Sequence, residues 1–342
     1  MRKMLNVLYV TSPQSYLSRE RENVIVHIED KEAFRIPVHN LEGIVTFGYA
    51  GMSPALIHLC CERGVAVSFL RENGEFLGRI QGSVSGNVLL RRKQYRLADD
   101  QGCVQLAQRF IFAKIANSRA VLNRGLRDHG NQIDSWKVKE SAGNLKHQIF
   151  SVLNAESLDQ LRGIEGEAAR YYFSAINELI LQEKSFFQMN GRNRRPPKDP
   201  VNAMLSFLYT LLCHEAVSAL ETVGLDPAVG FLHRDRPGRP SLALDLMEEL
   251  RAYMVDRLVL TLINRKQIQP DGFQIKENGA VSMTRDARKE IITAWQKRKQ
   301  EEILHPYLNE KIPVGLLPYA QALLLARHIR GDLQQYPPFL WK

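Results

Sequence analysis

The chain has 342 residues, enough for two domains that each bury a hydrophobic core. Hydrophobic residues make up 44% and charged residues 24%, which is ordinary globular composition and excludes a disordered chain. The net charge of +9 is compatible with a polyanionic partner, although many basic proteins bind none. The four cysteines form no CxxC pair, so we expect free thiols in a reducing cytoplasm rather than zinc or disulfides.

The first ten residues place basic residues before apolar ones, as a signal peptide does. The apolar run is interrupted at Asn6 and no small-residue cleavage site follows, so a strand is expected instead. No stretch approaches the roughly 18 uninterrupted apolar residues of a membrane span. We therefore expect a cytoplasmic protein without a membrane segment.

Residues 1–82 predict a small β-rich domain, because short segments rich in Val, Ile and Phe alternate with polar turns. A single short helix is expected at Pro54–Arg63, with Ser53 as N-cap and Gly64 as C-cap. Residues 83–94 open with Ser and Gly and predict a linker. The expected strands are 5–10, 23–29, 34–38, 41–47, 65–70 and 75–81.

Residues 95–342 predict a larger, mainly α-helical domain, which makes the fold class α+β. The segment 201–223 is apolar nearly all round and should be a buried helix. Residues 336–339 contain two prolines and are expected to form a loosely held tail. The expected helices are 104–122, 158–184, 201–223, 241–263, 285–304 and 316–330, with a broken helical stretch at 124–150 and a hairpin at 273–283.

Glu165 is a candidate metal ligand, because Gly163 and Gly166 flank it within a predicted helix. Each glycine costs about 1 kcal/mol against alanine in a helix interior, so their presence suggests a close approach to the backbone. Glu167 competes for the same role. Acidic residues in the first turn of a helix are also explained by the helix dipole alone.

A second group of candidate ligands follows at His233, which precedes a loop rich in Pro, Gly and Arg. A helix is expected from Ser241, and on it Asp245 and Glu248 share a face. If that face is buried, the carboxylates need a cation or hydrogen-bond donors, while Glu249 is the member that could be solvated. Two carboxylates and an imidazole without a thiolate suit Mg²⁺ or Mn²⁺.

Basic residues gather in two segments that lie near these candidates in the sequence or join predicted helices. Each segment could simply be a solvated loop, but together they would form a phosphate-tracking surface that leads to the metal. The candidate DNA-binding residues are Arg192, Arg194, Arg195 and Lys198 in one loop, and Arg234, Arg236 and Arg239 beside the candidate ligands.

These motifs resemble those of the CRISPR adaptation integrase family, the endonucleases that insert new spacers. The matching segments are 162–166, 199–203, 230–233 and 241–249, in the same order and spacing, and the resemblance covers essentially the full length, nearest to the subtype I-C branch. It implies a homodimer and a Mg²⁺ or Mn²⁺ ion held by Glu165, His233 and Glu248, with Asp245 nearby. Family members commonly carry Asp at the position of Glu248, so it stays open whether Asp245 or Glu248 is the stronger metal ligand.

The resemblance also implies a reaction, in which the 3′-hydroxyl of a protospacer DNA strand attacks a phosphodiester at the edge of a CRISPR repeat. This transesterification needs no nucleotide cofactor, and the sequence contains no P-loop motif. A small ferredoxin-like companion protein would bridge two dimers into a heterohexamer. The alternatives are a structure-selective DNA nuclease that joins nothing and a DNA-binding scaffold with structural carboxylates.

Overall fold

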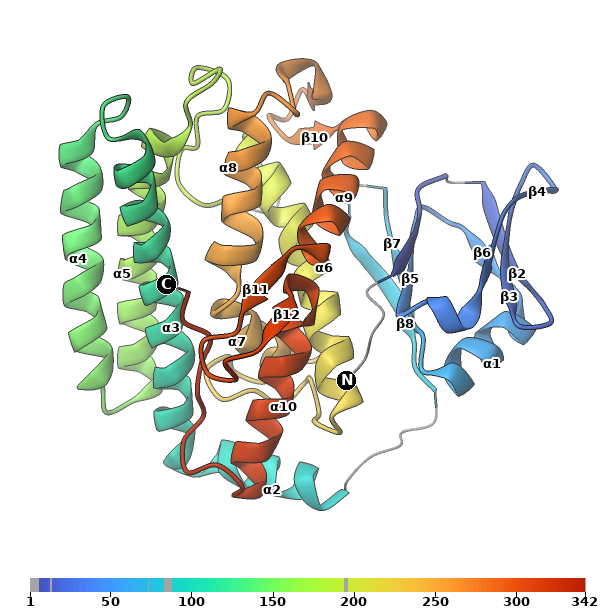
Figure 1. Ribbon diagram of the computed structural model, residues 1–342, viewed down its shortest axis with the longest axis horizontal. Helices are drawn as coiled ribbons and strands as arrows, with labels where there is room; N and C mark the ends of the chain where they lie inside the picture. Colours follow the sequence, from blue (N-terminus) through green and yellow to red (C-terminus); the bar gives the residue numbers. More distant parts are fainter. Residues whose placement is uncertain (1–5, 13, 73, 83–87, 194–195, 342) are drawn as a thin grey trace. The chain divides into compact units, whose positions relative to one another are not determined.

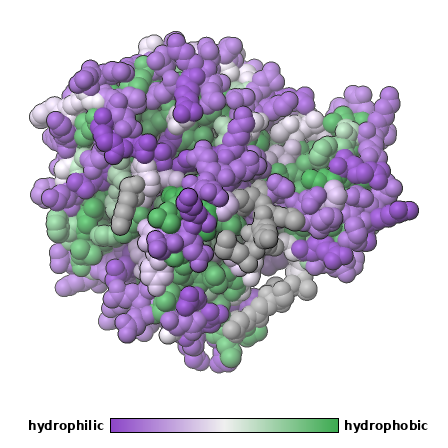
Figure 2. All heavy atoms as spheres, viewed as in Figure 1, coloured by the Kyte–Doolittle hydropathy of each residue, from purple (hydrophilic) through white to green (hydrophobic). Residues whose placement is uncertain are grey.

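The computed structural model describes residues 6–12, 14–72, 74–82, 88–193 and 196–341. The chain divides into two compact units, Met1–Ser85 and Gly86–Lys342 (Figure 1). The first unit is β-rich and the second is mainly helical, which confirms the predicted α+β class. On the face drawn in Figure 2, hydrophilic side chains predominate, in keeping with the burial of apolar residues inside each unit.

The N-terminal unit contains two four-stranded sheets. In the first, in the order β1-β5-β7-β8, the neighbours are parallel except for the antiparallel pair β7 and β8. In the second, in the order β4-β3-β2-β6, the first three strands form an antiparallel meander and β6 is parallel to β2. The strands are β1 (Val7–Val10), β2 (Ser15–Glu20), β3 (Asn23–Ile28), β4 (Lys31–Pro37), β5 (Gly43–Phe47), β6 (Gly51–Met52), β7 (Ala66–Leu70) and β8 (Phe76–Ile80).

Helix α1 (Pro54–Arg63) has the predicted bounds because both of its caps act as the sequence indicates. The Ser53 hydroxyl accepts from the backbone N–H of Leu56, and Gly64 ends the helix with a φ of 65°. The helix buries Leu56 and Leu59 in a core that both sheets share. A short 3₁₀ turn, η1 (Val38–Asn40), precedes β5.

Helices α3, α4 and α5 pack in sequence in the second unit, and the apolar helix α6 packs against α7, α10 and η3. Among the described residues, α6 alone is long and apolar enough to cross a membrane, and most of it is buried, as predicted for a core helix. The helices are α2 (Val88–Asp99), α3 (Gly102–His129), α4 (Ser135–Leu153), α5 (Leu158–Ile176), α6 (Pro200–Thr222), α7 (Ser241–Glu248), α8 (Arg257–Asn264), α9 (Arg285–Gln300) and α10 (Leu317–Arg330).

Shorter elements complete this unit. The π-helical segment η3 (Arg251–Asp256) joins α7 to α8, so the single helix predicted over 241–263 is interrupted. The predicted hairpin at 273–283 is present as β9 and β10, whereas β11 and β12 form a hairpin that was not predicted. These elements are η2 (Asn177–Leu179), η4 (Pro270–Gly272), β9 (Phe273–Ile275), β10 (Val281–Met283), β11 (Glu302–Leu304), β12 (Lys311–Pro313) and η5 (Val314–Leu316).

The predicted linker 83–94 is wrong over residues 88–94, which belong to α2. Residues 83–87 lie outside the described residues. The helix is held in place because Leu90 is buried and Gln94, also buried, donates to the backbone carbonyls of Asp226 and Val229. Packing within the second unit therefore outweighs the flexible composition before it.

The prediction of a loose C-terminal tail is also wrong. Tyr336 and Phe339 are almost fully buried. The Tyr336 hydroxyl and the backbone N–H of Phe339 donate to the carboxylate of Glu249. Asn117 of α3 donates to the carbonyl of Phe339 and accepts from the N–H of Trp341. The tail is thus fixed against α3 and the end of α7.

Candidate functional site

The predicted ligands come from α5, from α7 and from the loop that precedes α7 in the helical unit. Glu165 lies on α5, His233 lies in the loop before α7, and Asp245 and Glu248 lie on α7 itself. Helix α3 contacts α5, α7 and η3. The sequence left open whether the helix face that carries Asp245 and Glu248 is buried, and both residues are almost fully buried.

Asp245 organises the loop that carries His233. Its Oδ2 accepts from the N–H groups of Phe231 and Leu232, at 2.6 and 3.0 Å. Its Oδ1 lies 3.0 Å from the N–H and 2.6 Å from the ring Nδ1 of His233. Because a carboxylate oxygen accepts, Nδ1 carries the hydrogen of this bond, and Nε2 is the ring nitrogen that a neutral imidazole would offer to a metal. Asp245 is therefore a residue that orients His233, and its own oxygens are already occupied.

Gly230 is required for this arrangement. A Cβ added at this position would lie 2.8 Å from Asp245 Oδ2 and 2.8 Å from the backbone carbon of Ser241. The side chain of Arg162, on α5, holds the same loop by donating to the carbonyl of Leu232 at 2.9 and 3.1 Å. The motif 230–233 thus encodes a backbone that packs directly on α7.

Glu248 lies at the centre of the candidate site. Its Oε1 lies 4.0 Å from His233 Nε2 and 3.0 Å from a guanidinium nitrogen of Arg251. Its Oε2 lies 2.8 Å from Lys114 Nζ, which also forms an ion pair with Glu165. Burial would raise the pKa of Glu248, but the positive charges of Arg251 and Lys114 lower it to about 2. The carboxylate is therefore ionised across the physiological range.

Lys114 and Arg251 were not predicted from the sequence. Burial would lower the pKa of Lys114, but Glu248 and Glu165 outweigh this effect and raise it, which keeps the ammonium charged. Arg251 stacks over the ring of Tyr209 at 5.0 Å, and the Tyr209 hydroxyl donates to Asp256 at 2.6 Å. Lys114 lies about fifty residues before Glu165, and no local motif marks it.

The three predicted ligands do not converge as they stand. No group of three His, Cys, Asp or Glu side chains in the described part of the chain is close enough to hold a metal ion. The ammonium of Lys114 lies between Glu165 and Glu248 instead. The ammonium lies 2.8 Å from Glu248 Oε2 and balances the charge of this buried carboxylate.

These observations fit a hard divalent cation. Two carboxylates and a free imidazole nitrogen are ligands suited to Mg²⁺ or Mn²⁺. The ammonium of Lys114 marks a position where two carboxylates attract a positive charge. Glu165, His233 and Glu248 can therefore hold such an ion if Lys114 moves aside.

The two competing carboxylates have other partners. Glu167 accepts from Gln148 and from the hydroxyl of Tyr171 on an exposed surface of α4 and α5. Glu249, which the sequence suggested could be solvated, is fully buried, so that expectation is wrong. Burial raises the pKa of Glu249 to about 7, against the opposing effect of donors that include Tyr336.

The glycines beside Glu165 do not serve packing within the chain. A Cβ at Gly163 or Gly166 would meet nothing within 4 Å among the described atoms, and both positions are exposed. The close approach that the sequence suggested is thus not made by the described part of the chain.

The predicted DNA-binding residues are arranged unequally. Arg192 folds onto α6, where it donates to Asn202 and Ser206, so it acts within the fold. Arg194 and Arg195 lie outside the described residues. Lys198 and Arg236 are exposed, Arg239 is half-buried, and the exposed Arg234 pairs with Asp159 at 2.8 Å.

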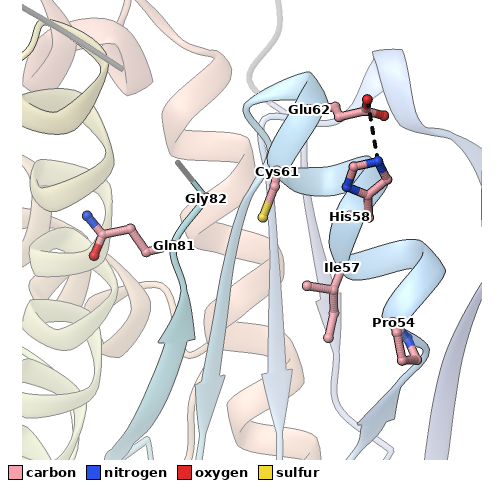
Figure 3. Close-up of a pocket in the computed structure, with 7 residues that line it drawn as sticks. All are labelled: Pro54, Ile57, His58, Cys61, Glu62, Gln81 and Gly82. Atoms are coloured by element: carbon pink, nitrogen blue, oxygen red, sulfur yellow. Dashed lines mark ion pairs between the residues drawn. The ribbon is translucent and has the colours of Figure 1, made fainter. Parts of the chain in front are cut away.

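A cavity in the N-terminal unit contains none of the predicted site residues. It has a volume of about 510 Å³ and is lined by α1 and the residues after β8 (Figure 3). His58 and Glu62 form an ion pair at 3.5 Å beside it, and Cys61 points toward it. No catalytic arrangement is formed by these side chains.

Solved structures with the same architecture define the class of fold. A casposase bound to integration product has a TM-score of 0.84 at 22% identity, covering 97% of this chain and 92% of that one. A CAS1 protein from Thermotoga maritima has a TM-score of 0.81 at 23% identity, covering 98% of this chain and all of the other. The protein therefore has the fold shared by casposases and Cas1 proteins.

Sequence comparison gives the family. The model of CRISPR associated protein Cas1 matches residues 8–297. The chain is 54% identical over 343 residues to CRISPR-associated endonuclease Cas1 1 of Chlorobaculum tepidum, and 49% identical over 346 residues to CRISPR-associated endonuclease Cas1 2 of Rhodospirillum rubrum. Both alignments cover the whole of each chain. The chain belongs to the Cas1 family.

Proposed function

We propose that this protein is a metal-dependent DNA endonuclease and integrase that inserts protospacer DNA into a CRISPR array. The observation that carries the proposal is the buried Glu248, which faces His233 Nε2 on one side and, through Lys114, Glu165 on the other. The names of the full-length relatives support an endonuclease, and the casposase bound to integration product supports joining.

Glu165, His233 and Glu248 would hold Mg²⁺ or Mn²⁺, which supplies Lewis acidity toward a phosphodiester and favours ionisation of an attacking hydroxyl. Asp245 keeps the lone pair of His233 Nε2 directed at Glu248. Lys114 and Arg251 balance the negative charge of the carboxylates and are near enough to assist in binding the scissile phosphate. Exposed Lys198, together with Arg236, would contact the DNA backbone.

The reaction proposed is attack of a protospacer 3′-hydroxyl on a repeat phosphodiester. One phosphodiester bond forms as another breaks, and the proton of the attacking hydroxyl is transferred to the leaving oxygen by way of solvent. The energy of the broken bond is retained in the new one, so no nucleotide cofactor is consumed.

The proposed partners are protospacer and repeat DNA, a second copy of the chain, and a small ferredoxin-like companion that completes a heterohexamer in the cytoplasm. A structural relative described as part of a Cas6-RT-Cas1–Cas2 complex supports a companion protein; it has a TM-score of 0.84 and this chain covers 36% of it. The subtype I-C assignment stays a prediction that rests on the sequence motifs alone.

A joining assay tests the proposal. Labelled protospacer duplex with 3′-hydroxyl ends is incubated with a repeat-bearing plasmid and Mn²⁺, with and without the companion. Label transferred to the plasmid, and lost in Glu165→Ala, supports the integrase. Cut DNA without transfer favours the structure-selective nuclease, and bound but unchanged DNA in both proteins leaves the DNA-binding scaffold.

A further inference from the structure

An arginine outside the candidate metal site lies between two aromatic rings. The guanidinium of Arg257, at the start of α8, lies 4.1 Å from the ring centroid of Trp341 and 5.1 Å from that of Tyr253. Trp341 is close to the end of the chain, and both it and Arg257 are half-buried. The aromatic faces fix the plane of the guanidinium while leaving part of it open to solvent.

Two further arginines surround the same rings. Arg124, from α3, lies 5.7 Å from the Trp341 centroid, and Arg298, from α9, lies 4.6 Å from that of Tyr253. Arg124 forms an ion pair with Asp128, and Arg298 forms one with Glu301. We call Arg124, Arg257, Arg298, Tyr253 and Trp341 the arginine–aromatic cluster.

Arg257 has no carboxylate partner in the described part of the chain, unlike the other two arginines of the cluster. Burial, together with the neighbouring charges of Arg298 and Arg124, lowers the pKa of Arg257 to about 10. Two of the three arginines are thus balanced by carboxylates, and the positive charge of Arg257 is left without one among the described residues. An anion that reached Arg257 would relieve this repulsion.

The docked C-terminal tail holds the cluster against α3, the helix that also carries Lys114 of the candidate site. Asn117 holds the backbone of Trp341, and Glu249, the neighbour of Glu248, holds the backbone of Phe339. Lys114 and Arg124 lie ten residues apart on that helix, so Arg124 is roughly 15 Å from Lys114 along the helix axis. The axis of a DNA duplex rises 3.4 Å per nucleotide of one strand, so this axial separation corresponds to about four nucleotides of duplex.

We propose that the arginine–aromatic cluster binds phosphate groups of the substrate DNA strand about four nucleotides from the reacting phosphodiester. The proposal rests on the proposed function in taking DNA as the ligand. Arg257 supplies a planar, oriented guanidinium that matches two phosphate oxygens, and Arg124 is exposed enough to contact the next phosphate. The cluster would hold the strand in register with the metal-bound end.

Binding of DNA to the intact protein tests this without any chemistry. Fluorescence anisotropy measures the Kd of a blunt duplex and of the same duplex with a single-stranded 3′ tail, across a series of salt concentrations. The variant is Arg257→Gln. The matched control is Lys297→Gln, which removes one exposed positive charge from α9 beside Arg298 but outside the cluster.

We expect Arg257→Gln to weaken DNA binding roughly fivefold to tenfold and to reduce the slope of log Kd against log salt by about one, as for one lost phosphate contact. Lys297→Gln should change Kd less than twofold. Weakening confined to the tailed duplex assigns the phosphates to an unpaired strand, whereas equal weakening of both DNAs assigns them to duplex. Equal Kd values for Arg257→Gln and Lys297→Gln would overturn the proposal.

Arg124→Gln provides a second variant if Arg257→Gln melts at a lower temperature than the wild type, because Arg124 is half-exposed. It should weaken binding about threefold, and no effect in this variant would again count against the cluster. The readout also separates this proposal from the proposed function. If Arg257→Gln and Lys297→Gln bind DNA equally while the wild type joins DNA, only the proposal for the cluster fails. If the wild type joins no DNA while the two variants still differ in Kd, only the proposed integrase function fails.

Discussion

The substitution Asp245→Asn tests whether Asp245 orients His233 or itself binds the metal. An amide has one oxygen where the carboxylate has two, so two of the four donors from residues 231–233 lose their acceptor. Hydrogen bonds to a charged group contribute about 1.5–3 kcal/mol each, so a stability loss of about 3 kcal/mol or more is expected. The amide also removes the carboxylate that keeps hydrogen on His233 Nδ1, so Nε2 takes it in part of the molecules.

The consequence should be weaker metal binding that high metal concentration overcomes. Loss of a residue that orients a ligand typically costs tenfold to a hundredfold in metal affinity, which is about 1.4–2.8 kcal/mol. Mn²⁺ titration by electron paramagnetic resonance measures the affinity, and circular dichroism shows that the variant is folded. Asp235→Asn, in the same loop but exposed, is the control and should bind normally. Wild-type affinity in Asp245→Asn would refute the reasoning, as would activity absent even at saturating Mn²⁺.

Four further substitutions have defined outcomes. Lys114→Gln removes the ammonium between Glu165 and Glu248, so the melting temperature without metal should fall by the equivalent of roughly 3 kcal/mol. Mn²⁺ should then raise the melting temperature of the variant more than that of the wild type. An equal rise in both proteins would contradict this. Gly230→Ala forces Ser241 or Asp245 to move and should cost about 1–3 kcal/mol in urea unfolding, whereas Gly166→Ala, in open space, should gain about 0.5–1 kcal/mol. Because the pKa of Glu249 is raised to about 7 from its usual 4.5, the folded state binds the proton of this carboxyl more tightly than the unfolded state does. The contribution of Glu249 to the free energy of unfolding therefore falls by about 3 kcal/mol as the pH rises from 4.5 to 7. Glu249→Gln should show a smaller loss of unfolding free energy between pH 4.5 and 7 than the wild type, and an unchanged loss would count against that assignment.

The fold could be predicted where local signals and packing agree. Helix α1 follows directly from Ser53, Pro54 and Gly64, which act as the caps their chemistry suggests. Strand β2, Ser15–Glu20, could not be predicted because its residues are largely polar and it exists through pairing with β3 and β6. The tail could not be predicted either, because its burial depends on Glu249 and Asn117, far away in the sequence.

The candidate site was predictable as a set of acidic and imidazole side chains, but not in its charge balance. The sequence left Asp245 and Glu248 open as rivals; Asp245 accepts hydrogen bonds from residues 231–233, whereas Glu248 pairs with Lys114 and Arg251. Lys114 and Arg251 carry no local motif, and they matter only because packing of α3 and η3 brings them to Glu248. Long-range pairing of this kind is invisible to residue spacing.

The central claim is that Glu165, His233 and Glu248 hold one divalent ion, and anomalous diffraction from crystals soaked in Mn²⁺ tests it most directly. We predict a peak about 2.0–2.3 Å from a carboxylate oxygen of each glutamate and from His233 Nε2, with the ammonium of Lys114 displaced from between the glutamates. A peak elsewhere, or Lys114 still bridging Glu165 and Glu248 at saturating Mn²⁺, would contradict the claim.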